Sequence, residues 1–252
     1  MQRLIFLWQS DDVDRASLLS WPYYHLALFL SETKIIMKTF LSIGTGPGIG
    51  LATAERFSTE GFNTVLSSRH PERLGQYVRK CQKEGRVSTA MGVDASDPLS
   101  IQQLLTTMFQ QYGSIDVLHY NAASLRQSNI ADQPANTFLS DLSVNIVGAM
   151  VAIQTVLPMM LAQGQGTILL TGGRFGVIPA PEYISLSIGK AGIRSLVMGL
   201  FDDLKRQGIH IGTVTASALT GADSAWSQGV AQAFWQLYCT PYDDWVAEIA
   251  YP

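Results

Sequence analysis

Residues 39–50, which read TFLSIGTGPGIG, decide the fold of this chain. Thr39 to Ile43 form a short apolar and β-branched run typical of a buried strand, and a helix-like stretch begins at Ile49. The turn between them contains Gly44, Gly46, Gly48 and Gly50. Glycines let backbone N–H groups approach an anion closely, and a helix N-terminus favours its negative charge. A strand, a glycine-rich turn and a helix in this order predict a phosphate-binding site.

Strand-like and helix-like segments alternate from this point onward. Short runs rich in Val, Ile, Leu and Thr predict strands at 38–43, 62–67, 87–93, 115–120, 167–171 and 209–215. Periodic apolar residues predict helices at 49–60, 71–84, 97–112, 135–162 and 183–207. Glycines suited to left-handed C-caps follow these stretches at Gly61, Gly85, Gly113, Gly164 and Gly208. The pattern predicts an α/β, single-domain Rossmann fold, with a doubly wound, mostly parallel sheet of about seven strands and helices on both faces.

Residues 1–36 lack both the strand alternation and the helical periodicity of the rest. Met37 and Lys38 stand directly before the first strand, as at the start of many parallel-sheet domains. We therefore expect 1–36 to be a peripheral extension, or an artefact of an upstream start, and 37–252 to be one dinucleotide-binding domain.

The composition narrows the range of partners. Of the 252 residues, 47% are hydrophobic and 15% are charged, which suits a sizeable buried core, and the net charge of −3 does not suggest a nucleic-acid partner. No apolar run approaches the ~20 residues of a membrane span, so no membrane partner is expected. Cys81 and Cys239 are interpreted as free thiols in a cytoplasmic protein, and no metal site is expected.

The end of the second predicted strand bears on the choice of ligand. It reads Leu66-Ser67-Ser68-Arg69-His70, about 20 residues past the glycines. Arg69 beside Ser68 suits the ribose 2′-phosphate of NADP, through charge-assisted hydrogen bonds. The glycine turn also resembles the loop that binds S-adenosylmethionine in methyltransferases. That alternative wants an acidic residue where Ser42 stands and a carboxylate at the end of the second strand, so the sequence favours NADP.

Five motifs follow one another along the chain: the loop at Gly44, Gly48 and Gly50, then Asp94-Ala95, then Asn121-Ala122-Ala123, then Asn145, and then the segment around Lys190. Taken together, they resemble the short-chain dehydrogenase/reductase family over essentially all of 37–252. The resemblance implies that Asp94 meets the adenine amino group, that Lys190 binds the nicotinamide ribose, and that Asn145 helps to hold a water of the proton relay. It also implies a small carbonyl or alcohol substrate and a homodimer or homotetramer.

Two residues of the family's chemistry are missing. The general acid/base tyrosine of the family lies four residues before the lysine, where this chain has Leu186, and its serine falls on Gly173. Tyr183 shares a helical face with Ser187 and Lys190, so we consider it a substitute proton donor. Seven residues span roughly 10 Å of helix axis, which argues against direct contact with Lys190, and a packing role for Tyr183 remains the alternative.

Other residues also have both a functional and a structural interpretation. His119, inside the fourth strand, is interpreted as a hydrogen-bonded core residue rather than a base. Arg174 and Phe175 follow the double glycine on the expected substrate side, with a solvated loop as the equal alternative. The aromatic residues of 226–245 suit packing or an oligomer interface, and 244–251 suits a last edge strand.

The sequence thus predicts an NADP-dependent oxidoreductase that moves hydride between nicotinamide and a carbonyl or alcohol. A catalytically silent NADP-binding protein of the same fold is the alternative, since the acid/base pair is absent. An S-adenosylmethionine-dependent methyltransferase is a distant third.

Overall fold

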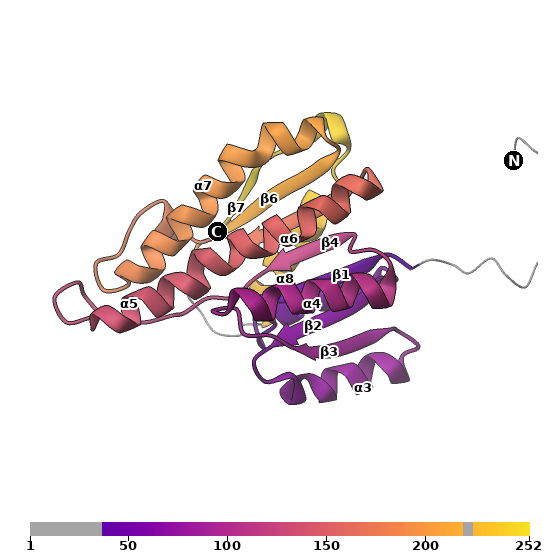
Figure 1. Ribbon diagram of the computed structural model, residues 1–252, viewed down its shortest axis with the longest axis horizontal. Coiled ribbons are helices and arrows are strands. Elements are labelled where there is room, and N and C mark those ends of the chain that lie inside the picture. The colour runs from indigo at the N-terminus through magenta and orange to yellow at the C-terminus, as the bar shows by residue number, and fades with distance from the viewer. Residues whose placement is uncertain (1–36, 219–223) are drawn as a thin grey trace, which may run out of the picture. The chain divides into compact units, whose positions relative to one another are not determined.

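The computed structural model describes residues 37–218 and 224–252 (Figure 1). Seven strands form one sheet: β1 (Thr39–Ile43), β2 (Asn63–Ser68), β3 (Ser88–Gly92), β4 (Val117–Tyr120), β5 (Gly166–Thr171), β6 (Ile209–Ala216) and β7 (Glu248–Tyr251). Helices follow the strands: α2 (Ile49–Thr59), α3 (Gly75–Lys83), α4 (Pro98–Tyr112), α5 (Ala135–Leu142), α6 (Gly148–Gln163), α7 (Ile184–Arg206) and α8 (Ser224–Cys239). The predicted extension at 1–36 lies outside the described residues, so its role stays a prediction.

The strands are all parallel and run in the order β3-β2-β1-β4-β5-β6-β7. The order reverses between β1 and β4, because the chain winds outward first to one side and then to the other. Ligands of such sheets bind outside the carboxyl ends of the strands at this reversal. The glycine turn and the segments after β4 and β5 therefore meet at one edge, as the sequence predicts.

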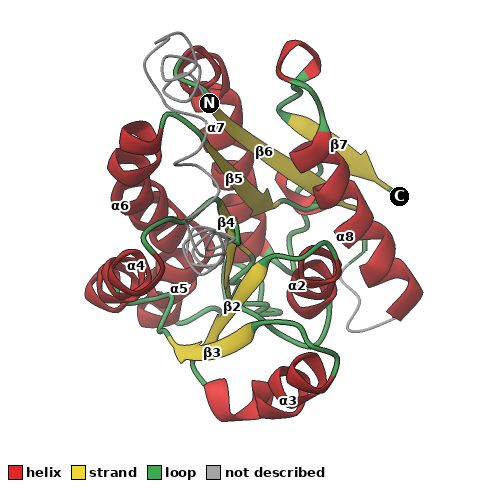
Figure 2. Ribbon diagram, turned by 90° about the vertical axis from the view of Figure 1, so that its right-hand side faces the viewer, coloured by secondary structure: helices red, strands yellow, loops and turns green. Residues whose placement is uncertain are grey.

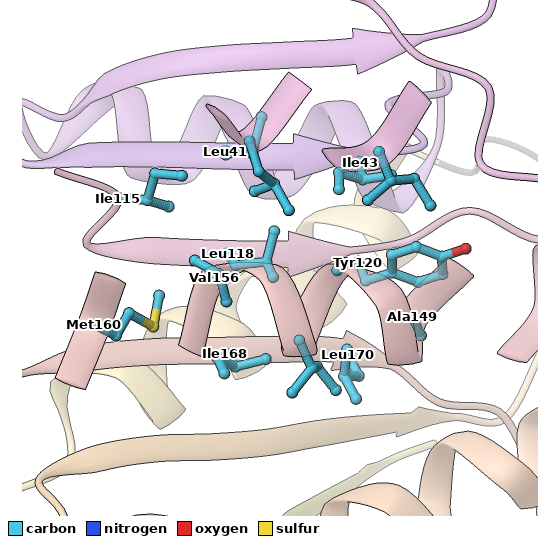
Figure 3. Packing of buried hydrophobic residues seen from close by; sticks show 14 of the residues in the cluster. Leu41, Ile43, Ile115, Leu118, Tyr120, Ala149, Val156, Met160, Ile168 and Leu170 are labelled. Carbon is cyan, nitrogen blue, oxygen red and sulfur yellow. The ribbon is translucent and has the colours of Figure 1, made fainter. Parts of the chain in front are cut away.

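Helices cover both faces of the sheet (Figure 2). On one face α4, α6 and α7 pack over a cluster that includes Leu41, Leu118 and Leu170, part of which Figure 3 shows. On the other face α2, α3 and α8 pack over a cluster that includes Phe40, Phe57 and Phe234. With apolar residues buried on both faces, the strands read as continuous hydrophobic runs, which explains why they lack alternation.

The helix ends follow the predicted signals. The Asp97 carboxylate accepts a hydrogen bond from the Leu99 N–H, and Pro98 opens α4. The five predicted C-cap glycines have φ between 70° and 85°, where a side chain is strained. Trp226, Phe234, Trp235 and Tyr238 lie on α8, which packs against α2, whereas Trp245 follows a 3₁₀ turn after it. The predicted edge strand is β7, parallel to β6.

One predicted helix is more complicated in the structure. The stretch predicted as a single helix over 135–162 consists of α5, a π-helical turn (Ser143–Val147) and α6. A π turn inserts one residue into the helix and redirects nearby backbone carbonyls, often at functional sites. Here the Val144 carbonyl accepts a hydrogen bond from the Tyr120 hydroxyl at 2.7 Å. The insertion leaves no trace in the apolar periodicity, so the sequence analysis missed it.

Two helical stretches, Ala135–Gln163 and Ile184–Arg206, are long and apolar enough to cross a membrane by length and composition alone. The sequence analysis expected no such segment. Both stretches pack against the sheet, α6 on β5 and α7 on β6. A core helix of a doubly wound sheet needs this apolar character, so the finding is weak support for a membrane span.

Gly44 offers a direct test of how closely the glycine turn approaches β4. Its φ is +85°, and a Cβ there would lie 2.4 Å from the Ala122 backbone nitrogen. Gly61 has the same φ, with open space around it. We expect Gly61→Ala to cost about 1 kcal/mol, from the strained backbone alone. Gly44→Ala adds overpacking of about 1–3 kcal/mol. Urea denaturation measures both, and equal losses would contradict the close approach.

Candidate active site

Two adjoining hollows lie at the carboxyl edge of the sheet. The outer groove, of about 780 Å³, runs from Arg69 to Val144 past the glycine turn. The inner cavity, of about 270 Å³, lies between the glycine turn, the end of β5 and α7. The two share Gly46, Pro47, Asn121, Ala123 and Leu125. Every predicted cofactor residue lines one hollow or both: Gly44, Gly46, Gly48, Ile49, Gly50, Ser68, Arg69, Asp94, Ala95, Asn121, Ala122 and Lys190.

The glycine turn presents unused hydrogen-bond donors to both hollows. The Gly44 and Thr45 N–H groups donate to the Ser67 carbonyl. The N–H groups of Gly46, Gly48, Ile49 and Gly50 have no acceptor within the described residues. No side chain caps α2 at Gly48, although a helix N-terminus normally has its free donors satisfied. The donor set therefore fits a pyrophosphate.

Two arginines line the outer groove close to the end of β2. Arg69 and Arg73 both line it, and neither forms an ion pair with a described carboxylate. Across the groove, the Asp94 carboxylate accepts hydrogen bonds from the Ser96 N–H and hydroxyl, which hold the pKa of Asp94 below its ordinary value. The sequence analysis named Arg69 and missed Arg73, whose place in the groove depends on the 3₁₀ turn Pro71–Leu74. Two free guanidinium groups suit an additional phosphate.

A buried chain of hydrogen bonds connects three strands to the glycine turn. Thr171 Oγ1 donates to Asn121 Oδ1 at 2.9 Å, and Asn121 Nδ2 donates to the Gly44 carbonyl at 2.8 Å. His119 Nε2 lies 3.1 Å from Thr171 Oγ1, and Nδ1 lies 3.2 Å from Ser42 Oγ. Because the Thr171 proton is used on Asn121, His119 must donate from Nε2 and accept from Ser42 at Nδ1.

The chain of hydrogen bonds through His119 and Thr171 has two consequences for the chemistry of the site. Burial, with a smaller contribution from the charge of Lys190, lowers the pKa of His119 to about 3, so His119 is neutral and lines neither hollow. The sequence interpretation of His119 as a hydrogen-bonded core residue agrees with this placement. The Thr171 hydroxyl lines the inner cavity, yet its proton points to Asn121. Thr171 therefore positions Asn121 and offers a substrate no free proton.

Lys190 forms the wall of the inner cavity opposite the glycine turn. Its Nζ donates to the Thr171 carbonyl at 2.6 Å, which leaves two N–H bonds unused. Burial lowers the pKa of Lys190 to about 8, because a low-dielectric surrounding disfavours the ammonium form. The stem of Lys190 also passes beside Gly173, where a Cβ would lie 3.6 Å from Lys190 Cγ. An ammonium group thus lies at the end of β5.

The two substituted positions also line the inner cavity. Leu186 lies one helical turn before Lys190 and is 1% exposed. Gly173 has an extended backbone, with φ 177° and ψ 150°, which any residue adopts. Phe175 and Arg174 line the cavity as well, on the substrate side that the sequence predicts. Neither Leu186 nor Gly173 carries an ionisable group.

Tyr183, the predicted substitute donor, lies apart from this arrangement. It stands at the N-cap of α7, and its ring stacks on Phe175 with centroids 5.5 Å apart. Tyr183 is not among the residues that line either hollow. Ser187, which could bridge Tyr183 and Lys190, is buried and bonded to the Ala180 backbone. The contacts of Tyr183 are those of a packing residue, and its predicted part as a substitute proton donor stays a prediction.

Asn145 lies in the π turn behind the site and holds the loop after β4. Its Oδ1 accepts from the Ser124 N–H at 2.7 Å, and its Nδ2 donates to the Ser124 carbonyl at 3.2 Å. The residue lines neither hollow. Its predicted part in holding a water stays a prediction, while the side chain's contacts are those of a loop anchor.

The sequence analysis also missed Asp141, a second anchor of the same loop. Its buried carboxylate accepts hydrogen bonds from Ser124, Arg126, Gln133 and Ser185. Burial alone would raise the pKa of Asp141, but the bonds from Arg126, Ser124 and Ser185 outweigh it and hold that pKa below its ordinary value. An aspartate in a helical stretch gives no sign in the sequence that four distant donors will converge on it.

The neutral state of His119 predicts a pH dependence of stability. The folded pKa of about 3 lies below the ordinary 6.5, so the unfolded chain binds the extra proton first as pH falls. Stability from this group is complete above pH 6.5 and is lost toward pH 3, by about 2 kcal/mol between pH 7 and pH 5. Urea denaturation of wild type and His119→Gln at both pH values measures this loss, with His70→Gln in an exposed loop as the control. An equal loss in wild type and His119→Gln would contradict the assignment.

Comparisons with known proteins agree with this geometry. The chain is 30% identical over 193 residues to glucose 1-dehydrogenase of Gluconobacter oxydans, covering 75% of this chain and 72% of that protein. It superposes on a short-chain dehydrogenase from Rhodopseudomonas palustris with a TM-score of 0.79 and 23% identity, covering 85% of this chain and 98% of that one. A metagenomic short-chain oxidoreductase in complex with NADP gives the same TM-score at 19% identity, covering 85% and 96%.

The family comparison covers most of the chain. The sequence profile of the short chain dehydrogenase family matches residues 38–229, which include the glycine turn, the loop after β4, the end of β5 and Lys190. The protein belongs to the short-chain dehydrogenase/reductase family of oxidoreductases.

Proposed function

We propose that this protein is an NADP-dependent oxidoreductase that transfers hydride between the nicotinamide and a small carbonyl or alcohol. One observation carries the proposal: a continuous pair of hollows combines free backbone donors at the glycine turn with two unpaired arginines at one end and Lys190 at the other. NADP needs these features in this order, namely a 2′-phosphate site, a pyrophosphate site and a nicotinamide ribose site. The methyltransferase alternative lacks support, because the family match covers the same glycine turn.

The residues that line the two hollows would each have a part in the reaction. Bound NADPH would supply the hydride. The N–H groups of Gly46, Gly48 and Ile49 would hold the pyrophosphate, and Asn121 would fix the turn through the Gly44 carbonyl. Lys190 would reach the nicotinamide ribose with one of the two N–H bonds not used on Thr171. The apolar surfaces of Leu186 and Phe175 would exclude water from the reacting carbonyl.

A silent NADP-binding protein is the second candidate, and a specific observation favours it. Leu186 and Gly173 stand where the tyrosine and serine of the family are expected, and the Thr171 hydroxyl is used within the protein. Without a general acid, turnover would fall by ~10²–10⁴. The two candidates agree on NADP binding and differ only in the rate of reduction.

Arg69 tests the preference for NADP over NAD. We expect Arg69→Glu to raise the Kd for NADPH about 10–100-fold, the effect of losing a charge-assisted bond to phosphate, with little change for NADH. Calorimetric titration measures both constants, and Arg79→Glu, on α3 outside the groove, is the control. Equal losses for the two nucleotides would contradict the 2′-phosphate site.

Replacing Leu186 and Gly173 tests whether a tyrosine and a serine at these positions would speed the reduction. Gly173 accepts a Cβ at ordinary contact distance, so Gly173→Ser fits the extended backbone. We expect the double variant Leu186→Tyr, Gly173→Ser to reduce an activated dicarbonyl, phenanthrenequinone, faster than Leu186→Phe, Gly173→Ser, by up to the ~10²–10⁴ of a general acid, because tyrosine adds a hydroxyl that donates a proton and phenylalanine does not. Absorbance at 340 nm measures the rate, and calorimetry confirms that both variants bind NADPH. Equal rates would show that a tyrosine at this position does not serve the reaction.

A further inference from the structure

We propose that the Lys190 ammonium group is itself the proton donor to the substrate oxygen, in place of the missing tyrosine. The proposal rests on the proposed carbonyl reduction and assigns its acid. It begins with the described lining of the inner cavity, which includes only two ionisable side chains, Lys190 and Arg174. An arginine keeps its proton in proteins, so among these residues Lys190 alone can give one up.

The hydroxyl and amide groups of the cavity do not compete for this role. The Thr171 proton is used on Asn121, and the Asn121 amide is used on the Gly44 carbonyl. Lys190 keeps two N–H bonds after the one to the Thr171 carbonyl. Its ammonium is therefore the described donor with protons to spare at the inner end of the cavity.

The two substitutions give the ammonium access to the substrate. A leucine side chain is shorter than a tyrosine and has no polar end, so the space above Leu186 belongs to the cavity that it lines. Without a side chain at Gly173, the stem of Lys190 lies across the position from which a serine would project. A carbonyl oxygen seated in the inner cavity would share its lining with Lys190 and Gly173.

The charges around Lys190 make its proton transferable near neutral pH. Burial lowers the pKa of Lys190 to about 8, whereas an ordinary lysine near 10.5 is a weaker acid. Of the groups on the neighbouring elements, His119 on β4 is neutral and Arg174 is cationic, and on α7 itself Arg194 is paired with Glu248 at 2.9 Å. No described carboxylate forms an ion pair with Lys190, so nothing there restores an ordinary pKa.

The proposed step balances in protons and electrons. Bound NADPH would supply the hydride to the carbonyl carbon and become NADP⁺, while the π electrons of the carbonyl move to its oxygen. The oxygen takes a proton from Lys190 Nζ, the N–H electron pair stays on nitrogen, and the products are an alcohol and a neutral amine. A proton from bulk solvent then restores the ammonium, so each reduction takes up one proton from solution. Oxidation of an alcohol follows the same path in reverse.

The first test needs no cofactor. Acetylation of the lysines by acetic anhydride, followed peptide by peptide with mass spectrometry from pH 6 to pH 11, reports the protonation of each amine in the free protein. We expect the midpoint for Lys190 to lie near pH 8, below the ordinary lysine value of 10.5. A midpoint at the ordinary value near 10.5 would overturn the proposal.

The second test separates proton transfer from ribose binding. Lys190→Arg keeps a cation that donates hydrogen bonds but gives up no proton, so NADPH should still bind while phenanthrenequinone reduction falls ~10²–10⁴-fold. In wild type the rate should decline as pH rises through about 8. In Lys190→Ala, added 2-fluoroethylammonium should restore more rate than ethylammonium, because it is the stronger acid of nearly the same size.

The outcomes distinguish this proposal from the proposed function. Failure of wild type to bind NADPH overturns the proposed function. Binding with no reduction by wild type overturns both the hydride transfer and the role of Lys190, and leaves the silent NADP-binding protein. Reduction by wild type with full activity of Lys190→Arg overturns only the role of Lys190 as donor. Equal rescue of Lys190→Ala by the two amines would likewise identify Lys190 as a positioning residue that binds the ribose.

Discussion

The site depends on the close approach of the glycine turn to the loop after β4. Gly44 lies against the Ala122 backbone at a distance that leaves no room for a side chain, and Asn121 bonds to the Gly44 carbonyl across the same contact. This approach aligns the turn with the end of β5, since Asn121 is held in its turn by Thr171. The free donors of the glycine turn and the ammonium of Lys190 thereby face one continuous space.

The outer and inner ends of the site differ in the chemistry that their residues offer. Every predicted cofactor position lines the two hollows, and the charges at the outer end suit a phosphate-rich ligand. At the inner end, Leu186 and Gly173 line the cavity without a hydroxyl or an ionisable group, and the Thr171 hydroxyl serves the internal hydrogen-bond chain. A buried lysine without a carboxylate partner among the described residues is then the chemically interesting feature. Burial lowers the pKa of the Lys190 ammonium group and so makes it a stronger acid than an ordinary lysine.

The loop after β4 shows how far the site depends on residues away from the ligand. Asp141 and Asn145 lie in or beside the π turn and bind the same segment through Ser124. The loop carries Leu125, which lines both hollows. The shape of the substrate side therefore depends on a buried carboxylate and a helix irregularity as well as on the cavity residues themselves.

The sequence by itself determined the order of strands and helices, the glycine turn, and a set of residues, including Arg69, that line the two hollows. These are local signals: glycine positions, caps and apolar runs act within a few residues of one another, and parallel strands bring their carboxyl ends to one edge. Boundaries were accurate where a cap marks them, as at Asp97. Arg73 escaped notice because a 3₁₀ turn, rather than spacing, carries it into the groove.

Only the tertiary structure decided which groups share the inner cavity and what each is free to do. Tyr183 stacks on Phe175, the Thr171 proton points to Asn121, and four separate donors converge on Asp141. The physical reason is that burial and hydrogen-bond partners come from segments far apart in the chain. They set the acidity of Lys190 and the neutrality of His119, and no periodicity or motif encodes them.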